Sequence, residues 1–293
     1  MKSNLFFDFL SLKCDTITEN MGGKMININS DKCIGCNACV KECVGAFIKN
    51  DNGKAVYTAK KCMGCGHCIA VCPVNAVSMI DERYDLSQIE DTDENYGKID
   101  SDLLLKALKS RRSIRQYTKK KVEKEKLKKM IEAGRYTATA VNYQSNQFII
   151  VQDRMEEFKK IAWEAFHIYL SKMSEDEIKN FSILAKAVKY DGTNEENETL
   201  FWGAPCLIIV VSEKPSRPWD SGMATQAMEL MANAQGLGAL FSGFMVRVIN
   251  SSEKLQQWLG IENLDVMTCM LVGYPAVKFL RTVPRKHPHV TYK

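Results

Sequence analysis

The spacing of apolar residues predicts a short strand-containing part followed by a longer mixed part. Strand-like runs at Met25–Ile28 and Ala55–Thr58 each precede a group of cysteines, and Asp51-Asn52-Gly53 between them is typical of a turn. Further along, apolar runs alternate with helical patterns, so we expect an α+β or α/β domain. The runs that predict its buried strands are 147–152, 206–211 and 265–272.

Two helices are predicted at the start of the longer part. Asp102–Lys109 follows Ser101, a suitable N-cap, and Lys119–Ile131 is expected to end at Gly134. The lysine-rich start of the second helix is better explained as a solvated helix face than as a docking patch. Residues 156–202 have a helical pattern of variable polarity and are interpreted as a lid or an arm of a dimer.

These patterns divide the chain into four parts. Residues 1–24 are an extension of unknown role, whose apolar patch is interrupted by Asp8 and is too short for a secretory signal. Residues 25–82 hold the cysteine groups, 83–100 are an acidic and polar linker, and 101–293 form the second domain. No stretch is long enough to span a bilayer, so we expect a cytoplasmic protein with no membrane partner.

Composition adds little to this picture except through cysteine. The chain of 293 residues is 45% hydrophobic and 26% charged, and a net charge of +5 is too mild to indicate a nucleic-acid partner. Without a secretory signal its 11 cysteines are expected to be reduced rather than paired in disulfides. Cys206 and Cys269 lie in apolar runs and are expected to be small, buried core residues, while Cys14 lies in the extension.

The other eight cysteines form two groups with the spacing C-x2-C-x2-C-x3-C, which repeats after 29 residues. Four thiolates so spaced can wrap an iron–sulfur cubane, because the short loops let three sulfurs converge while the fourth points elsewhere. Structural zinc sites instead favour C-x2-C pairs separated by a longer gap. The spacing therefore predicts two [4Fe-4S] clusters. The groups are Cys33, Cys36, Cys39 and Cys43, and Cys62, Cys65, Cys68 and Cys72.

This stretch resembles the bacterial two-[4Fe-4S] ferredoxin, in which the fourth cysteine of each group ligates the other cluster. The first group departs from that pattern, since Val44 stands where the second group has Pro73. The departure affects the expected local turn but not the ligands. The resemblance implies that one cluster is held by Cys33, Cys36, Cys39 and Cys72, and the other by Cys62, Cys65, Cys68 and Cys43.

A second chemical pattern follows the first predicted helix. Arg111, Arg112 and Ser113 can grip a phosphate dianion by charge-assisted hydrogen bonds, and Arg115 would point to the same side in an extended segment. Alone, this pattern is common on solvated surfaces. Together with three later stretches, it resembles the nitroreductase family of FMN-dependent flavoproteins over about residues 101–290. The later stretches are 139–144, 236–244 and 273–286.

The resemblance implies an FMN phosphate site and a cation beside the flavin. Arg111 and Ser113 would hold the phosphate, Arg285 would close the cage, and Arg112 lies within the same binding stretch. Arg115 would stand near the pyrimidine edge of the flavin, where a positive charge stabilises the reduced form.

The resemblance also implies contacts to the flavin ring and a homodimer with FMN at its interface. Backbone N–H groups of Ser242 and Gly243 would approach the flavin N5 region, and glycine permits that close approach. In this family the framing residues often come from the partner subunit. The residues that would frame the flavin are Thr139, Asn142 and Gln144.

Taken together, the two parts predict an iron–sulfur flavoprotein oxidoreductase. Electrons would pass from a low-potential donor such as ferredoxin through the two clusters to FMN, and on to a small organic acceptor: a nitroaromatic, a quinone or an activated alkene. No catalytic side chain is predicted, because the cofactor carries the chemistry, and no G-x-G-x-x-G fingerprint of a dinucleotide domain is present. The alternatives are a flavin dehydrogenase that exports electrons through the clusters, an electron-transfer module serving a partner protein, and a flavin sensor.

Overall fold

A computed structural model provides the structure of the chain. The extension at 1–24, including Cys14, lies outside the described residues, as do residues 181–199 of the predicted lid or dimer arm. The described residues are 25–59, 62–180, 200–214 and 216–293. Among them no helix combines the length and apolar character needed to cross a bilayer.

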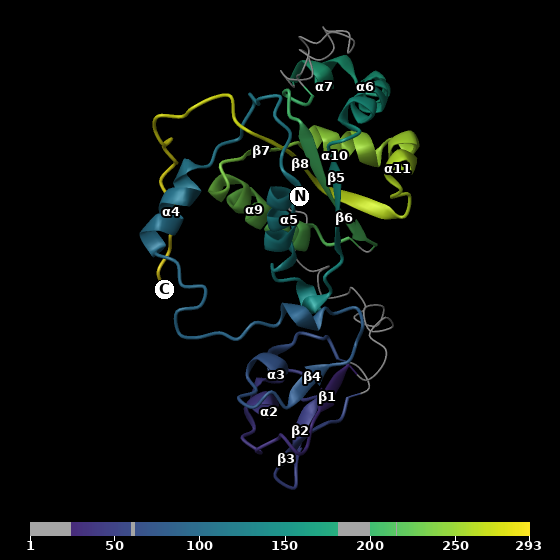
Figure 1. Cartoon of the computed structure of the whole chain (residues 1–293). Helices are drawn as coiled ribbons and strands as arrows, with labels where there is room; N and C mark the ends of the chain where they lie inside the picture. The colour runs from purple at the N-terminus through teal and green to yellow at the C-terminus, as the bar shows by residue number, and fades with distance from the viewer. Residues whose placement is uncertain (1–24, 60–61, 181–199, 215) are drawn as a thin grey trace. The chain divides into compact units, whose positions relative to one another are not determined.

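Unit 1 comprises the described residues up to Gly97 together with Val141–Tyr143. Its elements, purple to blue in Figure 1, are β1 (Ile26–Ile28), α2 (Ala38–Glu42), β2 (Ile48–Asp51), β3 (Lys54–Tyr57), α3 (His67–Ala70), β4 (Val77–Met79) and the short helix η2 (Leu86–Gln88). β1 pairs antiparallel with β4, and β2 pairs antiparallel with β3. The strands predicted before the two cysteine groups are therefore confirmed as β1 and β3.

The predicted turn joins β2 to β3. Asn52 and Gly53 have φ angles of 49° and 80°, and two successive left-handed residues are what a two-residue hairpin of type I′ requires. Glycine adopts this φ freely, and asparagine tolerates it better than most residues. The Asn-Gly pair thus fixes the register in which Asp51 faces Lys54.

Unit 2 comprises Lys98–Ala140 and Gln144–Lys293. Its sheet has the order β5-β6-β8-β7 and is antiparallel throughout, which makes this domain α+β. The three predicted strands are confirmed as β5, β6 and β8, whereas the four-residue β7 was not predicted. The elements are α4 (Ser101–Ser110), α5 (Lys124–Arg135), η3 (Ala140–Asn142, which ends in unit 1), β5 (Asn146–Val151), α6 (Met155–Ser171), α7 (Glu175–Asn180), β6 (Cys206–Glu213), α9 (Pro218–Ala234), β7 (Gly238–Phe241), α10 (Gly243–Asn250), α11 (Glu253–Leu259) and β8 (Leu264–Gly273).

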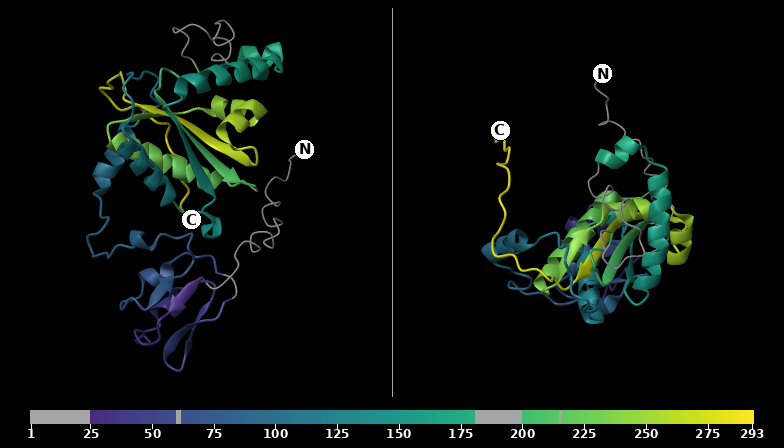
Figure 2. Two further views of the ribbon diagram at one scale, coloured as in Figure 1. Left: turned by 45° about the vertical axis from the view of Figure 1, so that its right-hand side comes forward. Right: turned by 90° about the horizontal axis from the view of Figure 1, so that it is seen from above.

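Helices cover both faces of this sheet, so unit 2 has three layers (Figures 1 and 2). Leu207 and Ile209 of β6 belong to a buried cluster that includes residues of α6, α10 and α11, whereas Cys206 and Ile208 belong to a cluster with α5 and α9. Successive side chains of a strand point to opposite faces, so β6 is apolar on both. Cys206 and Cys269 are buried, as expected.

The first helix of unit 2 begins one residue earlier than predicted. The N-cap of α4 is Asp100, whose carboxylate accepts a hydrogen bond of 2.7 Å from the Leu103 backbone N–H, so Ser101 lies inside the helix. α4 also buries none of its residues. Its leucines leave 38% to 60% of their surface exposed: Leu103, Leu104, Leu105 and Leu108.

The second helix begins later than predicted, at Lys124. Val122 is held outside the helix because its backbone N–H and carbonyl both bond to the side chain of Gln152, at 2.9 and 3.0 Å. Gly134 does not end this helix, which continues to Arg135. A Cβ at Gly134 would lie 3.0 Å from Met228 of α9, so the glycine allows α5 and α9 to pack closely.

Candidate functional site

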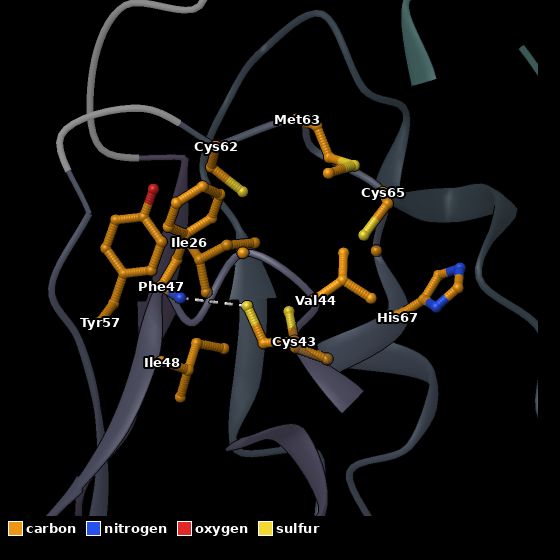
Figure 3. A pocket seen from close by; sticks show the side chains of 13 residues that line it. Ile26, Cys43, Val44, Phe47, Ile48, Tyr57, Cys62, Met63, Cys65 and His67 are labelled. Carbon is orange, nitrogen blue, oxygen red and sulfur yellow. Dashed lines mark hydrogen bonds between the residues drawn. The ribbon is translucent and has the colours of Figure 1, made fainter. Parts of the chain in front are cut away.

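The eight cysteines of unit 1 gather in two pockets. The first cysteine pocket is bounded on its apolar sides by residues that include Ile28 and Val77, and the second by residues that include Ile26 and Tyr57 (Figure 3). In each pocket three cysteines come from one group and one from the other. The first pocket holds Cys33, Cys36, Cys39 and Cys72, and the second holds Cys43, Cys62, Cys65 and Cys68.

Glycines shape the loop within each cysteine group. Gly35 and Gly64 occupy the same place in the repeat and have φ angles of 71° and 63°. At Gly35 an added Cβ would also lie 2.2 Å from the carbonyl oxygen of Gly53. The loops therefore curl back within two residues, which brings successive thiols to the same pocket.

Backbone N–H groups point at several of the sulfurs. Cys43 Sγ accepts a hydrogen bond of 3.3 Å from Phe47 N, which is drawn in Figure 3, and Cys62 Sγ accepts one of 3.4 Å from Gly64 N. In the first pocket, hydrogen bonds from the backbone N–H of Ala55 and of Gly35 hold the pKa of Cys33 below its usual value. Such donors stabilise negative charge on sulfur.

Burial acts on the thiols in the opposite direction. Burial, and then the neighbouring thiol of Cys65, raises the pKa of Cys68 to about 12, and burial followed by the Cys72 thiol raises the pKa of Cys39. Four thiols in one apolar pocket cannot all ionise without a compensating cation. Iron would supply that charge and displace the protons, as metals do when they bind thiols.

The spacing of the thiols suits a cluster better than a single ion. No three His, Cys, Asp or Glu side chains among the described residues are placed to hold one metal ion together. Zinc draws its four ligands to about 2.0–2.3 Å from one point, whereas each iron of a cubane takes a single cysteine at a separate corner. Thiols arranged around a pocket rather than about a point fit the [4Fe-4S] chemistry.

The arginine segment of unit 2 lies against the short strand β7. Ser113 forms a parallel bridge with Ala239, and Ile114 N donates to Ala239 O at 3.0 Å. β7 leads directly to Ser242 and Gly243, so β7 brings together two of the stretches that were singled out in the sequence. Arg115, two residues after Ser113, is exposed, and its guanidinium lies 5.9 Å from the ring centroid of Trp202.

Two of the arginines already have partners. Arg111 Nη1 lies 3.0 Å from Glu229 Oε1, and the Glu229 side chain is only 4% exposed. Arg112 Nη1 donates to the carbonyl oxygens of Lys109 and Arg111, at 2.7 and 2.5 Å. The Nε of Arg112 is buried without a hydrogen-bond partner in the described part of the chain. That orphaned donor fits an anionic ligand such as a phosphate.

Ser242 and Gly243 stand where a strand becomes a helix. Ser242 is the N-cap of α10, and its Oγ accepts a hydrogen bond of 3.4 Å from Met245 N. A Cβ added to Gly243 would meet no atom within 4 Å. The backbone here faces open space, which fits the close approach of a planar ligand.

The residues expected to frame the flavin are only partly brought together. Thr139 Oγ1 accepts a hydrogen bond of 3.1 Å from Gln144 N, and Gln144 has a positive φ of 51°. Asn142 groups with unit 1 rather than unit 2. Arg285 lies in the exposed segment that follows β8, and no described contact joins it to Arg111 or Ser113.

Three residues of these sites were not found by sequence reasoning. Glu229, the partner of Arg111, lies in the middle of a helix and carries no local signal. Asp220, in α9, accepts a hydrogen bond of 3.2 Å from Ala140 N through its carboxylate and so anchors the loop beside Thr139. Tyr57 could have been found, because the 29-residue repeat aligns it with Ile28 of the other half.

Comparisons with known proteins agree with this two-part organisation. The chain belongs to the nitroreductase family, whose model matches residues 108–274, more than half of its length. A model described as a 4Fe-4S dicluster domain matches residues 26–79. Both resemblances expected from the motifs are thereby confirmed, and the protein is an oxidoreductase of the nitroreductase type.

Two curated relatives and two solved structures are similar over much of the longer part. A protein of Archaeoglobus fulgidus, provisionally named NADH dehydrogenase/NAD(P)H nitroreductase, is 29% identical over 179 residues, 58% of this chain and 84% of that protein. One of the same name from Methanothermobacter thermautotrophicus is 27% identical, covering 61% and 81%. Nitroreductases with bound FMN from Bacteroides fragilis and Desulfitobacterium hafniense both have a TM-score of 0.52 at 23% identity. They cover 64% of this chain and 98% and 97% of their own, and show the fold alone.

Proposed function

We propose that this protein is an iron–sulfur flavoprotein that takes electrons from a low-potential donor of the ferredoxin type and reduces a small organic acceptor at an FMN site. Nitroaromatics, quinones and activated alkenes are the proposed acceptors. The observation that carries the proposal is the twofold convergence of four cysteines in the N-terminal unit of a nitroreductase-family chain. When bound, two [4Fe-4S] clusters supply one-electron transfer and FMN supplies hydride transfer.

Unit 1 would hold the clusters through its eight pocket cysteines. Backbone donors such as Phe47 N and Ala76 N, which lies 3.2 Å from Cys72 Sγ, stabilise negative charge on the ligand sulfurs. Apolar side chains along both pockets, among them Ile28 and Phe47, exclude water from the sulfurs. The burial of Cys33, Cys39 and Cys68 has the same effect.

Unit 2 would hold FMN at the ends of the Arg111–Arg115 segment and β7. Arg111, Arg112 and Ser113 would bind the phosphate, with the unpartnered Arg112 Nε as one donor. Arg115 would place a positive charge beside the flavin, and the backbone of Ser242 and Gly243 would face its ring. Thr139, Asn142, Gln144 and Arg285 would complete the site.

We propose further that the site is completed in a homodimer. α4 exposes its leucines, and an open apolar groove runs along one side of α9, where Trp219 is 75% exposed and Met223 45% exposed. A solvated monomer rarely leaves two helices with such uncovered apolar sides. A second copy of the chain would cover them and would bring its own loop and C-terminal segment to the FMN site.

The test is anaerobic turnover by the full chain carrying iron and flavin. With reduced ferredoxin as donor, we expect acceptor reduction that saturates with acceptor concentration. The names of the curated relatives mention NAD(P)H, so NADH and NADPH are the donors to compare. A Cys65→Ala variant should lose turnover driven by ferredoxin but retain turnover driven by dithionite, since the latter can reduce the flavin directly. Cys206→Ala, a buried cysteine outside both pockets, is the matched control.

Each outcome of this assay decides between mechanisms. NADH-driven turnover that is unchanged in Cys65→Ala would overturn the route through the clusters. Turnover that begins only after a partner protein is added would favour an electron-transfer module. Reduction of ferredoxin at the expense of a small substrate would favour a dehydrogenase working in the opposite direction.

A further inference from the structure

The second cysteine pocket contains a hydroxyl group that has no partner. The side-chain oxygen of Tyr57 is buried, and among the described residues it makes no hydrogen bond. Tyr57 lines the pocket together with Cys43 and Cys62, and Figure 3 draws it among the lining side chains. A buried hydroxyl without a partner destabilises the folded protein, which points to a bound group that the hydroxyl contacts.

The polar groups of the protein that act on this hydroxyl include the Cys62 thiol and the backbone of Met25. A phenol has a usual pKa of about 10 and is therefore protonated at neutral pH. A protonated phenol is a hydrogen-bond donor, and a thiolate or cluster sulfur is an acceptor. Among the described residues that line the pocket, no other side chain offers an oxygen.

The repeat within unit 1 provides an internal comparison. Tyr57 lies 29 residues after Ile28, the same offset that relates Cys33 to Cys62, and Ile28 lines the first cysteine pocket. At this equivalent position the first pocket has an apolar side chain and the second has a phenol.

One backbone donor is the same in the two halves. Phe47 N donates to Cys43 Sγ and its repeat equivalent, Ala76 N, donates to Cys72 Sγ, at 3.3 and 3.2 Å. The donors near the first cysteine of each group differ: Ala55 N donates to Cys33 Sγ at 3.5 Å in the first pocket, whereas the second pocket has the Tyr57 hydroxyl.

Other polar side chains at the pockets are already engaged. Asn37 Oδ1, at the first pocket, accepts from Asn50 Nδ2 at 2.6 Å, and His67 Nδ1, at the second, pairs with Glu42 at 2.9 Å. Lys54 Nζ donates to the carbonyl oxygen of Cys33 and adds positive charge at the first pocket. Because these other groups also act on the cluster potentials, the difference between Ile28 and Tyr57 does not tell which cluster has the higher potential. It indicates only that removing the Tyr57 hydroxyl should change the potential of the second cluster.

We propose that Tyr57 is a positioning residue for electron transfer: its hydroxyl donates a hydrogen bond to a sulfur of the second cluster and raises that cluster's reduction potential. A donor stabilises the reduced cluster more than the oxidised one, because reduction adds negative charge that is shared by the sulfurs. The inference rests on the proposed cluster ligation and deepens it by distinguishing the two sites.

The test is an anaerobic redox titration of the full chain, with the two clusters followed by EPR. In Tyr57→Phe the ring remains and only the hydroxyl is lost. We expect the reduction equilibrium of one cluster to become about tenfold less favourable, which for one electron is about 59 mV, while the other cluster is unchanged. The reciprocal variant Ile28→Tyr should raise the potential of the other cluster.

Tyr84→Phe is the matched control. The hydroxyl of Tyr84 faces Gly64, within 2.5 Å of where a Cβ would stand, rather than the pocket lining. An equal shift of the cluster potential in Tyr84→Phe would mean that the loss of any nearby hydroxyl has this effect. That result would overturn the specific role of Tyr57.

A measurement on the unaltered protein covers the case in which Tyr57→Phe fails to assemble its cluster. The hydroxyl proton of Tyr57 exchanges in D2O faster than the buried backbone N–H groups that are hydrogen-bonded to the sulfurs. Electron–nuclear double resonance should therefore show one rapidly exchanged proton coupled to one reduced cluster. If iron and cluster signals are absent altogether, the proposed function fails. If both clusters are present but this proton is not seen, only the role of Tyr57 fails. The same conclusion follows if Tyr57→Phe leaves both cluster potentials unchanged.

Discussion

Arg111 shows how a site residue can depend on a partner far away in the sequence. Its guanidinium pairs with Glu229, 118 residues later, and Gln226 Nε2 holds the second carboxylate oxygen at 3.1 Å. A buried carboxylate is stable only when such donors surround it. Glu229 therefore sets the direction of Arg111, and Arg111 in turn gives the buried Glu229 side chain a donor.

Removing that carboxylate should destabilise unit 2. For Glu229→Ala we expect a loss of about 1–3 kcal/mol in the free energy of unfolding, because Arg111 and Gln226 lose their acceptor. Glu229→Gln, which keeps one acceptor oxygen, should lose less. All four tryptophans, at 163, 202, 219 and 258, lie in unit 2, so urea denaturation followed by tryptophan fluorescence reports on this unit alone.

The matched control is Glu164→Ala. Glu164 pairs with Lys254 at the surface, where both side chains are at least 60% exposed, and such pairs contribute little. Equal unfolding curves for the two alanine variants would contradict a structural role for the pair between Arg111 and Glu229.

At the scale of residues, the sequence could predict which cysteines come together, but it could not predict which residues pair with the arginines. Ligand spacing is local: two or three intervening residues decide which thiols converge, and the same residues occur twice. The Arg111 partner and the Ala140 anchor, Asp220, come from α9, and nothing near either residue in the sequence indicates which way it faces. For Arg285 and Asn142, the roles implied by the resemblance stay predictions.

At the scale of elements, β7 positions the candidate flavin site although it has only four residues. Gly238 opens it, and a Cβ there would stand 2.4 Å from Ile114 Cγ1, so the glycine lets the arginine segment lie against the sheet. β7 was not predicted because a run this short between two glycines carries no period. Conversely, Gly134 was interpreted as a helix end, whereas helix packing explains it.

Two glycines of this region should respond differently to alanine. Gly243→Ala adds a Cβ that meets no protein atom, so stability should be unchanged, but FMN should bind about tenfold more weakly because the added methyl lies where the ring approaches. The measurement is flavin affinity by fluorescence quenching, beside the denaturation curve.

Gly238→Ala is the comparison, since its Cβ collides with Ile114. It should lower the free energy of unfolding by about 1–3 kcal/mol. Wild-type flavin affinity in Gly243→Ala would place the flavin elsewhere.

At the scale of the whole molecule, two helices of unit 2, α4 and α9, carry exposed apolar side chains. α4 exposes its leucines, and α9 exposes Trp219 beside its groove. A monomer would be expected to cover these apolar sides. The sequence predicted the helix α4 and its apolar side, but not that this side is uncovered, because burial depends on which element lies opposite.

A charge placed on this surface should separate the subunits. For Trp219→Glu we expect sedimentation as a monomer and loss of bound flavin, because a carboxylate cannot be buried against apolar side chains without a partner. Ile168→Glu is the matched control: Ile168 is 58% exposed but belongs to α6, in the layer on the other face of the sheet. Monomers in both variants, or dimers in both, would rule out this interface.

Cys36 and Cys65 hold the same place in the two cysteine groups, and both are exposed, whereas the other six pocket cysteines are buried or half-buried. Each pocket therefore has one cysteine that dissolved oxidants reach most easily. Thiolate sulfur in contact with solvent is the first to be oxidised, and a cluster that loses one corner ligand falls apart. The repeat that gives the protein two clusters thus also gives it two points of attack by oxygen, and the working range of such a chain is set by how well its surroundings exclude air.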